Sequence, residues 1–343
     1  MIKLRIIFIK LSTILLIMGF FPQSGYSQKQ TKSVPTRRPA STMGSYSFHP
    51  LLQVWFINDT LPSTSLNFKI RRAELGFKGQ LNEDTRWFIM VDPAQELQTS
   101  TTGPRLLRDV GVSFRLGGDT WLTAGQFFRP TTAEGFRSNK TLWFAERSFV
   151  SRIYGELREP GLMIESLIDS VTLKLMLSTG QGTNTLDNHN EKDLTFRAEL
   201  AASKEAGFGI FTSIEDMSFR RHSIYGLDFN LDALDWHLGV AGIFGHDQGR
   251  KDMGATLEFG YTFPIGLQPI IRGEYYRPNF DADAKADSFT VGFNYFMSKH
   301  NSKIQLSATS YRGMNGNDGT PIFSASTQNT RHTLCHLSFQ IGL

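Results

Sequence analysis

Apolar residues fall on every second position along most of the chain after residue 45. Residues 171–178, for example, place valine or leucine at the odd positions and mostly polar residues at the even ones. In an extended strand, such a period puts one set of side chains on each face. The pattern predicts about sixteen β-strands, at residues 46–57, 66–82, 85–97, 105–116, 120–128, 161–168, 170–179, 192–203, 207–217, 223–231, 235–245, 252–263, 269–280, 287–298, 303–312 and 331–343.

The segments between these strands alternate between short and long. Residues 82–84, 117–119 and 204–206 are tight turns, whereas residues 129–160 and 313–330 are long connections. Outer-membrane barrels have short periplasmic turns and long outer loops. The rhythm therefore predicts an all-β protein, a transmembrane antiparallel β-barrel of about 16 strands with both chain ends on the periplasmic side. A water-soluble β-sandwich of this size needs two domains, and no Pro/Ser-rich linker divides the chain.

The N-terminus has the three parts of a secretory signal. Lys3 and Arg5 precede an apolar core at residues 11–21, and Gly25 and Ser27 are small residues suited to a cleavage site. We therefore expect a signal peptide at residues 1–27, a polar periplasmic tail at 28–45 and a barrel at 46–343. This organisation predicts a location in the cell outer membrane.

Charge and cysteine content narrow the function further. The formal charge of +4 falls to about +1 when the leader is removed, which gives no argument for a nucleic-acid partner. The single cysteine, Cys335, excludes an internal disulfide framework and a cysteine-based metal site. No cofactor is expected.

Residues 129–160 form the longest stretch without a strand pattern after the leader. The stretch contains six basic and four acidic residues together with aromatic residues such as Trp143 and Phe149. A segment of this length inside a compact protein is functional or disordered, and its aromatic residues argue against disorder. We expect an ordered loop that folds into the barrel and narrows the pore.

Several segments together resemble the phosphate-selective porin O and P family. They are FKIRRAELGFKGQL at 68–81, WFIMVD at 87–92, AGQFFRP at 124–130, FAERSFV at 144–150 and REPG at 158–161. The resemblance implies a sixteen-stranded barrel, commonly trimeric, that passes anions by diffusion. It also implies that the loop after the fifth strand folds inward at mid-pore, which matches residues 129–160.

These observations predict a porin for passive diffusion of small hydrophilic solutes, in particular anions such as phosphate. Its expected partners are small anionic solutes, outer-membrane lipid and two further copies of the chain in a homotrimer. Basic rings favour anions, and inward acids in similar number make the expected preference mild. The residues expected to contact the anion are Arg137, Lys140, Arg147 and Arg152 on the loop, with Lys174 and Arg197 on the wall. The alternative for each is that it only pins the loop to acids of the wall.

Two other functions remain open from the sequence. A specific uptake channel for an organic anion or a sugar would use Trp143, Phe144 and Tyr276 as a sliding surface. An outer-membrane enzyme would need a Ser–His pair with an orienting group, but the eight histidines are scattered and no G-x-S-x-G elbow is present.

Two acidic and amide-rich clusters, at residues 281–287 and 315–318, are candidate calcium sites at loop tips. Solvated outer loops are the favoured interpretation of both, because neither contains a complete calcium loop.

Overall fold

The computed structural model describes residues 44–60, 66–98, 106–188, 190–217, 220–233, 235–247, 249–278, 285–314 and 330–343. Residues 1–43, which include the expected signal peptide and most of the expected tail, lie outside this range. So do Asp281, Asp283 and residues 315–318 of the two calcium candidates. None of the described helices is long and apolar enough to cross a membrane.

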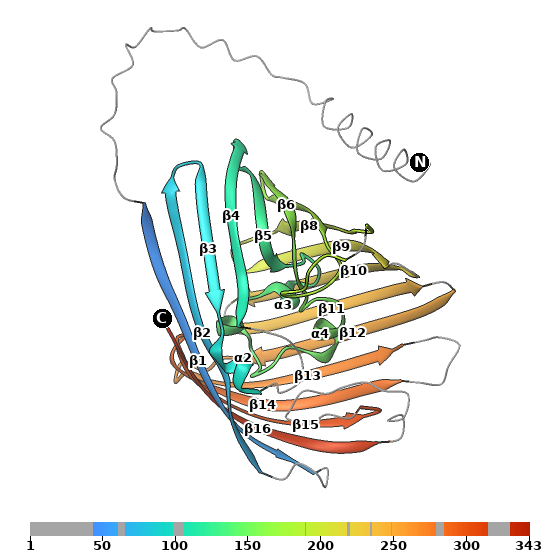
Figure 1. Ribbon diagram of the computed structural model, residues 1–343. Helices are drawn as coiled ribbons and strands as arrows, with labels where there is room; N and C mark the ends of the chain where they lie inside the picture. The colour runs from blue at the N-terminus through green and yellow to red at the C-terminus, as the bar shows by residue number, and fades with distance from the viewer. Residues whose placement is uncertain are drawn as a thin grey trace, which may run out of the picture. The chain divides into compact units, whose positions relative to one another are not determined.

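Sixteen antiparallel strands form a closed barrel (Figure 1). Each strand pairs with its neighbours in sequence, and β1 pairs with both β2 and β16. The strands are β1 (Ser45–Asp59), β2 (Asn67–Asn82), β3 (Thr85–Val91), β4 (Leu107–Gly117), β5 (Thr120–Phe128), β6 (Arg158–Ile168), β7 (Val171–Ser178), β8 (Asp193–Ala201), β9 (Ala206–Met217), β10 (Arg220–Ala233), β11 (Trp236–Asp247), β12 (Arg250–Tyr261), β13 (Leu267–Arg277), β14 (Ala286–Ser298), β15 (Ser302–Arg312) and β16 (Arg331–Gly342). The predicted antiparallel barrel and its strand count are confirmed.

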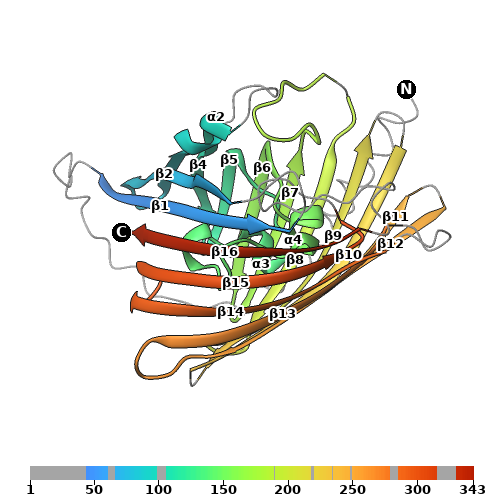
Figure 2. The same cartoon turned by 90° about the horizontal axis from the view of Figure 1, so that it is seen from below.

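Ring closure depends on the first and last strands. Leu51 lies opposite Gly342, and Asp59 lies opposite Leu334. Figure 2 shows β1 and β16 side by side, with the end of β16 close to the start of β1. Closure leaves no unpaired strand edge facing lipid, which a spanning sheet requires.

The two faces of the wall differ as the period-two pattern predicts. On β14, Phe289, Val291 and Phe293 point outward and are 55%, 44% and 51% exposed, whereas Ser288 and Thr290 at the alternate positions are buried. An apolar outer face suits contact with acyl chains, and a polar inner face suits a wet lumen. The barrel is therefore built to sit in a bilayer.

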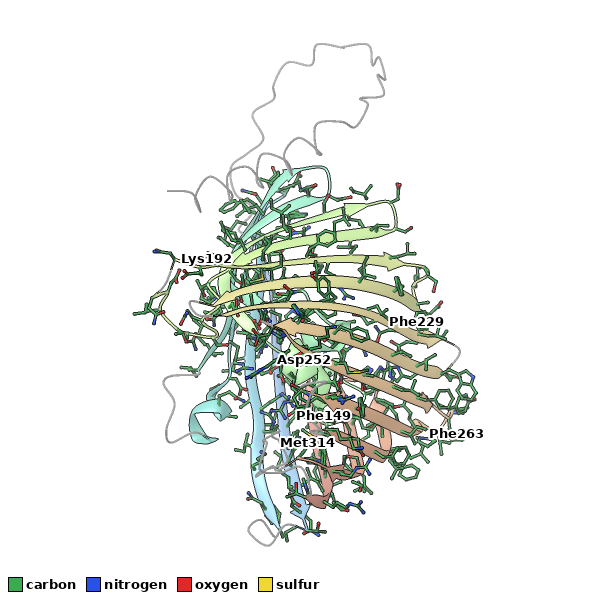
Figure 3. The ribbon with its side chains drawn as sticks, turned by 90° about the vertical axis from the view of Figure 1, so that its right-hand side faces the viewer. Phe149, Lys192, Phe229, Asp252, Phe263 and Met314 are labelled. Atoms are coloured by element: carbon green, nitrogen blue, oxygen red, sulfur yellow. The ribbon has the colours of Figure 1, made fainter. Side chains whose placement is uncertain are left out.

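Aromatic residues gather at the end of the barrel that carries the short turns. Trp236 lies 4.6 Å from Tyr261 and 5.2 Å from Phe259 between ring centroids, and Tyr261 lies 5.0 Å from Phe263. Figure 3 shows Phe263 at the end of these strands. Such clusters belong to the aromatic girdle at a membrane–water interface.

Several strand boundaries differ from the sequence prediction, and two of them adjoin a helix or the long connection after β5. Residues 93–97 were expected to extend a strand, but α2 (Pro93–Gln98) is helical. Pro93 suits the first turn of a helix, and the Asp92 carboxylate accepts a hydrogen bond from the Ala94 amide at 3.2 Å. In addition, β6 begins at Arg158, because Phe128 and Arg158 pair across β5 and β6.

Candidate functional site

The segment between β5 and β6, residues 129–157, is the constriction loop. It contains α3 (Ala133–Phe136), the 3-10 helix η1 (Asn139–Thr141) and α4 (Phe149–Tyr154). Its partners are widely spaced around the ring: Asn139 donates to Glu74 of β2, the Phe149 amide donates to Glu274 of β13, and Arg129 donates to Asp193 of β8. A segment that touches strands on all sides lies inside the barrel, as Figures 1 and 2 show for α3 and α4.

Helix α4 anchors the loop through an apolar cluster. Phe149, Val150 and Tyr154 are at most 2% exposed. Ser148 caps the helix, its hydroxyl accepting from the Ser151 amide at 3.0 Å. The wall and loop residues that complete the cluster are Trp55, Ile57, Ala145, Phe211, Ile224, Ile243, Ala286, Tyr311, Met314 and Leu334. Figure 3 shows Phe149 and Met314 inside the barrel.

Glu146 ties the middle of the loop to β2. Its carboxylate lies 2.5 Å from Arg71 Nη2 and 2.8 Å from Arg72 Nη2. Burial alone would raise the pKa of Glu146, but the two guanidinium groups outweigh it and hold this pKa well below its ordinary value. Glu146 is therefore an anion that the loop supplies to two wall cations.

Arg147 is buried within the loop. It is 2% exposed, and its side chain donates to Glu156 at 3.1 Å and to the Glu134 carbonyl at 3.0 Å. It also donates to Asn139 and to the Arg137 carbonyl. Burial lowers the pKa of Arg147. This predicted anion contact joins α3, η1 and the end of α4 to one another.

Three further predicted contacts carry a carboxylate partner. Arg152 lies 3.7 Å from Glu156, Lys174 lies 2.7 Å from Glu165, and Arg197 lies 2.7 Å from Asp228. The Arg197 side chain is only 1% exposed, whereas those of Arg152 and Lys174 are 24% and 18% exposed. The charge of each of these cations is thus largely compensated.

Arg137 and Lys140 differ from the other four predicted contacts. Both are partly exposed, and neither makes an ion pair with a described carboxylate. Arg137 donates to the neutral Asn230 of β10 at 3.0 Å. The structure therefore separates the six predicted residues into four compensated cations and two uncompensated ones.

Lys78 and Arg86 on the wall have the same property. The strand pattern predicts that both point inward, but they were not among the predicted anion contacts. Both are exposed and point inward by their register with the buried Glu74. The Arg86 guanidinium lies 3.7 Å from the ring of Trp121, which fixes its place without a carboxylate. Parity within β2 and β3 gives their direction, but only the coordinates show that no described acid pairs with them.

The four uncompensated cations lie in the same half of the barrel. Lys78 and Arg86 flank the short turn at residues 83–84, and the Lys140 carbonyl accepts from Gln340 near the end of β16. The four cations thus lie toward the end of the barrel that carries the short turns.

On the opposite side of the lumen, the constriction loop packs tightly against β13–β16. The space between them includes a cavity of about 10 Å³, room for about one water molecule. Its polar lining residues include Glu146, Arg147, Arg272, Thr290, Thr309 and His336.

Residues 58–220 match the family model described as phosphate-selective porin O and P. No curated protein matches the sequence.

Solved outer-membrane proteins share the fold. The anion-selective porin from Comamonas acidovorans superposes with a TM-score of 0.64 at 11% identity, covering 88% of this chain and 100% of that one. OmpT of Vibrio cholerae, in a trimer form, gives 0.63 at 9% identity over 88% and 100%. The outer membrane channel DcaP of Acinetobacter baumannii gives 0.60 at 12% identity over 89% and 99%.

The family match covers β2 to β9 and includes the constriction loop, and the closed sixteen-stranded barrel is the architecture of the similar solved structures. Over these residues the chain is therefore similar to the phosphate-selective porin O and P family, and its barrel has the fold of an outer-membrane porin.

Proposed function

We propose that this porin passes small hydrophilic solutes by diffusion and prefers anions, phosphate among them. The observation that carries the proposal is the solvent exposure of four inward cations that have no described carboxylate partner: Lys78, Arg86, Arg137 and Lys140. In a narrow lumen, where water is scarce, an uncompensated charge acts more strongly than in bulk water.

The solute route in this proposal follows the inner face of β2–β7. On this side, the inward side chains of Lys78 and Arg86 are exposed. On the other side, the inward residues Arg272, Thr290 and Gln305 are 4%, 1% and 2% exposed, respectively, and the constriction loop lies against that wall. An anion on this route therefore meets the wall cations Lys78 and Arg86 directly.

The preference is expected to be mild. Arg147, Arg152, Lys174 and Arg197 are paired, so their fields are largely cancelled at the distance of a passing ion. Weak attraction also favours a diffusion channel, because a tightly bound ion leaves slowly.

We also propose that the barrel has no enzymatic activity. In the described part of the chain, one hydrogen bond joins a serine to a histidine: Ser47 Oγ lies 2.8 Å from His49 Nε2. No described carboxylate forms an ion pair with His49, so the orienting group of a catalytic triad is missing there.

A specific channel for an organic anion is the second candidate. It was expected to use Trp143 and Phe144, but Trp143 packs 4.3 Å from His237 and Phe144 lies under Arg272 at 4.4 Å. Conductance with phosphate, chloride and a dicarboxylate separates the two candidates.

The test is planar-bilayer recording of the purified protein in a salt gradient. Wild type should give ohmic channels with a reversal potential on the anion side, in three equal steps for the trimer that we propose. Arg137→Glu and Lys140→Glu should each lower the anion preference, by about twofold for one charge seen through water. Lys204→Glu, an exposed residue in the turn between β8 and β9, is the charge-matched control.

An unchanged reversal potential in both loop variants would rule out the proposed route past the loop. A strong cation preference of wild type would rule out the anion preference itself.

A further inference from the structure

The two selective loop cations are carried on a short segment, residues 137–143, which we call the loop tip. The wall holds this tip through its main chain. Gln340 donates to the Lys140 carbonyl at 2.9 Å, and Lys303 donates to the Leu142 carbonyl at 2.5 Å. Asn294 and Gln305 donate to the Trp143 carbonyl at 2.7 and 3.0 Å.

Anchoring through carbonyl groups has a direct consequence for the side chains of the tip. Side chains of the wall donate hydrogen bonds to main-chain carbonyl oxygens of the tip. The side chains of Arg137 and Lys140 therefore do not serve as anchors to β14–β16. Trp143 adds two aromatic contacts, a tilted one 4.3 Å from His237 and an edge-on one 4.8 Å from His300 between ring centroids. The anchor therefore fixes the position of the tip without pairing the charge of either cation.

Lys303 is the unusual member of this anchor. Its side chain is completely buried, and no described carboxylate lies within ion-pair distance of it. The formal charges that act on it, Arg72 and Arg137, are also positive. Burying an ammonium without a counter-charge costs free energy. The neutral amides of Asn294 and Gln305 also donate hydrogen bonds to the main chain of the tip, and they do so without that cost.

The neighbouring His300 is placed to accept a hydrogen bond from Lys303. Nζ lies 3.3 Å from Nδ1 of His300 in the turn between β14 and β15. Burial, and then the charge of Lys303, lower the pKa of His300 to about 3, so the ring is neutral and Nδ1 accepts. The ammonium thus bridges the main chain of the tip and the turn of the wall.

We propose that Lys303 is a positioning residue for ion selection: it contacts no solute but fixes the loop tip so that Arg137 and Lys140 face the passing anion. The proposal rests on the proposed function for the identity of the ion, and on the geometry alone for the position of the tip. Lys303→Met removes the donor and the charge, whereas Lys303→Gln keeps a donor without the charge.

The experiment records unitary conductance and reversal potential for each variant, after gel migration with and without heating has shown a folded barrel. Lys303→Met should lower the anion preference by about twofold and change the unitary conductance. Lys303→Gln should recover part of both. Lys204→Met removes an exposed lysine from another short turn and should leave both unchanged.

Trp143→Ala removes the aromatic contacts of the same tip and leaves Lys303 unchanged. If Lys303→Met does not assemble, the same measurements on Trp143→Ala test the role of the anchor. A folded Lys303→Met barrel with wild-type conductance and wild-type preference would overturn the positioning role. Absence of anion preference in the wild-type channel would contradict the proposed function. A conductance change in Lys303→Met would in that case still support the positioning of the tip by Lys303.

Discussion

Glu146 and Glu165 are both lumen glutamates paired with cations, but their surroundings differ. Glu146 and its partner Arg72 have side chains 7% and 2% exposed, and Arg71 completes the group. Glu165 and its partner Lys174 are 38% and 18% exposed. Removing one member of a buried ion pair leaves the other charge without compensation, whereas an exposed pair contributes little.

We therefore expect Glu146→Gln to destabilise the barrel by about 3 kcal/mol. Glu165→Gln, the matched control, should cost less than about 1 kcal/mol. Urea titration of the reconstituted protein measures the two free energies of unfolding. Equal losses in the two variants would contradict the distinction between buried and exposed pairs.

Glu146→Gln should also change how the free energy of unfolding depends on pH. Because the folded pKa of Glu146 lies below the ordinary 4.5, its stabilisation is complete above pH 4.5 and is lost as the pH falls through the folded value. Glu146→Gln should lack this acid-dependent loss, which the titration repeated at decreasing pH detects.

The charged residues of the site were predictable, but their pairing was not. Period-two parity gives the direction of a side chain on a strand, and it placed Lys78 and Arg86 inside the barrel. An ion pair such as Arg72–Glu146 joins residues 74 positions apart, and no local pattern encodes it. Only the packing of the constriction loop decides that Arg147 is buried and Lys140 is not.

At the scale of elements, the strands were the predictable part, because a half-buried strand repeats its pattern over eight or more residues. The helix α2 was missed because Leu97 continues the apolar period of β3, although Pro93 and Asp92 carry the local signals of a helix start. The inward course of the loop followed from its length and aromatic residues, whereas its contacts with β13–β16 had no sequence signal.

Helix α4 is expected to hold the loop through its apolar side. Phe149 is 2% exposed within the apolar cluster, so Phe149→Ala should cost about 3–5 kcal/mol and loosen the loop inside an intact barrel. Limited proteolysis within residues 129–157, with conductance recorded in parallel, reports the loosening. Leu186→Ala, at a residue 88% exposed in the loop between β7 and β8, should behave as wild type. A protease-resistant Phe149→Ala loop would show that the ion pairs suffice.

The whole molecule depends on an apolar outer surface. Leu306 of β15 is 51% exposed and lies between Phe293 and Leu337 on the neighbouring strands. Leu306→Arg places a charge against lipid and should cost about 2–4 kcal/mol if the position lies near the bilayer midplane. Refolding into vesicles measures the yield, and Leu306→Phe should refold normally. Normal refolding of the arginine variant would place this face against protein or water.

Pairing of β1 with β16 joins Leu51 to Gly342, about 290 residues apart. Bringing the ends of a flexible segment of this length together costs about 5 kcal/mol of chain entropy. β1 leaves the ribosome long before its second partner, so the seam forms only after β16 has been synthesised. A truncated chain that lacks β16 would therefore form a sheet with unpaired edge strands. We expect such a chain to be degraded and not to form a smaller working pore.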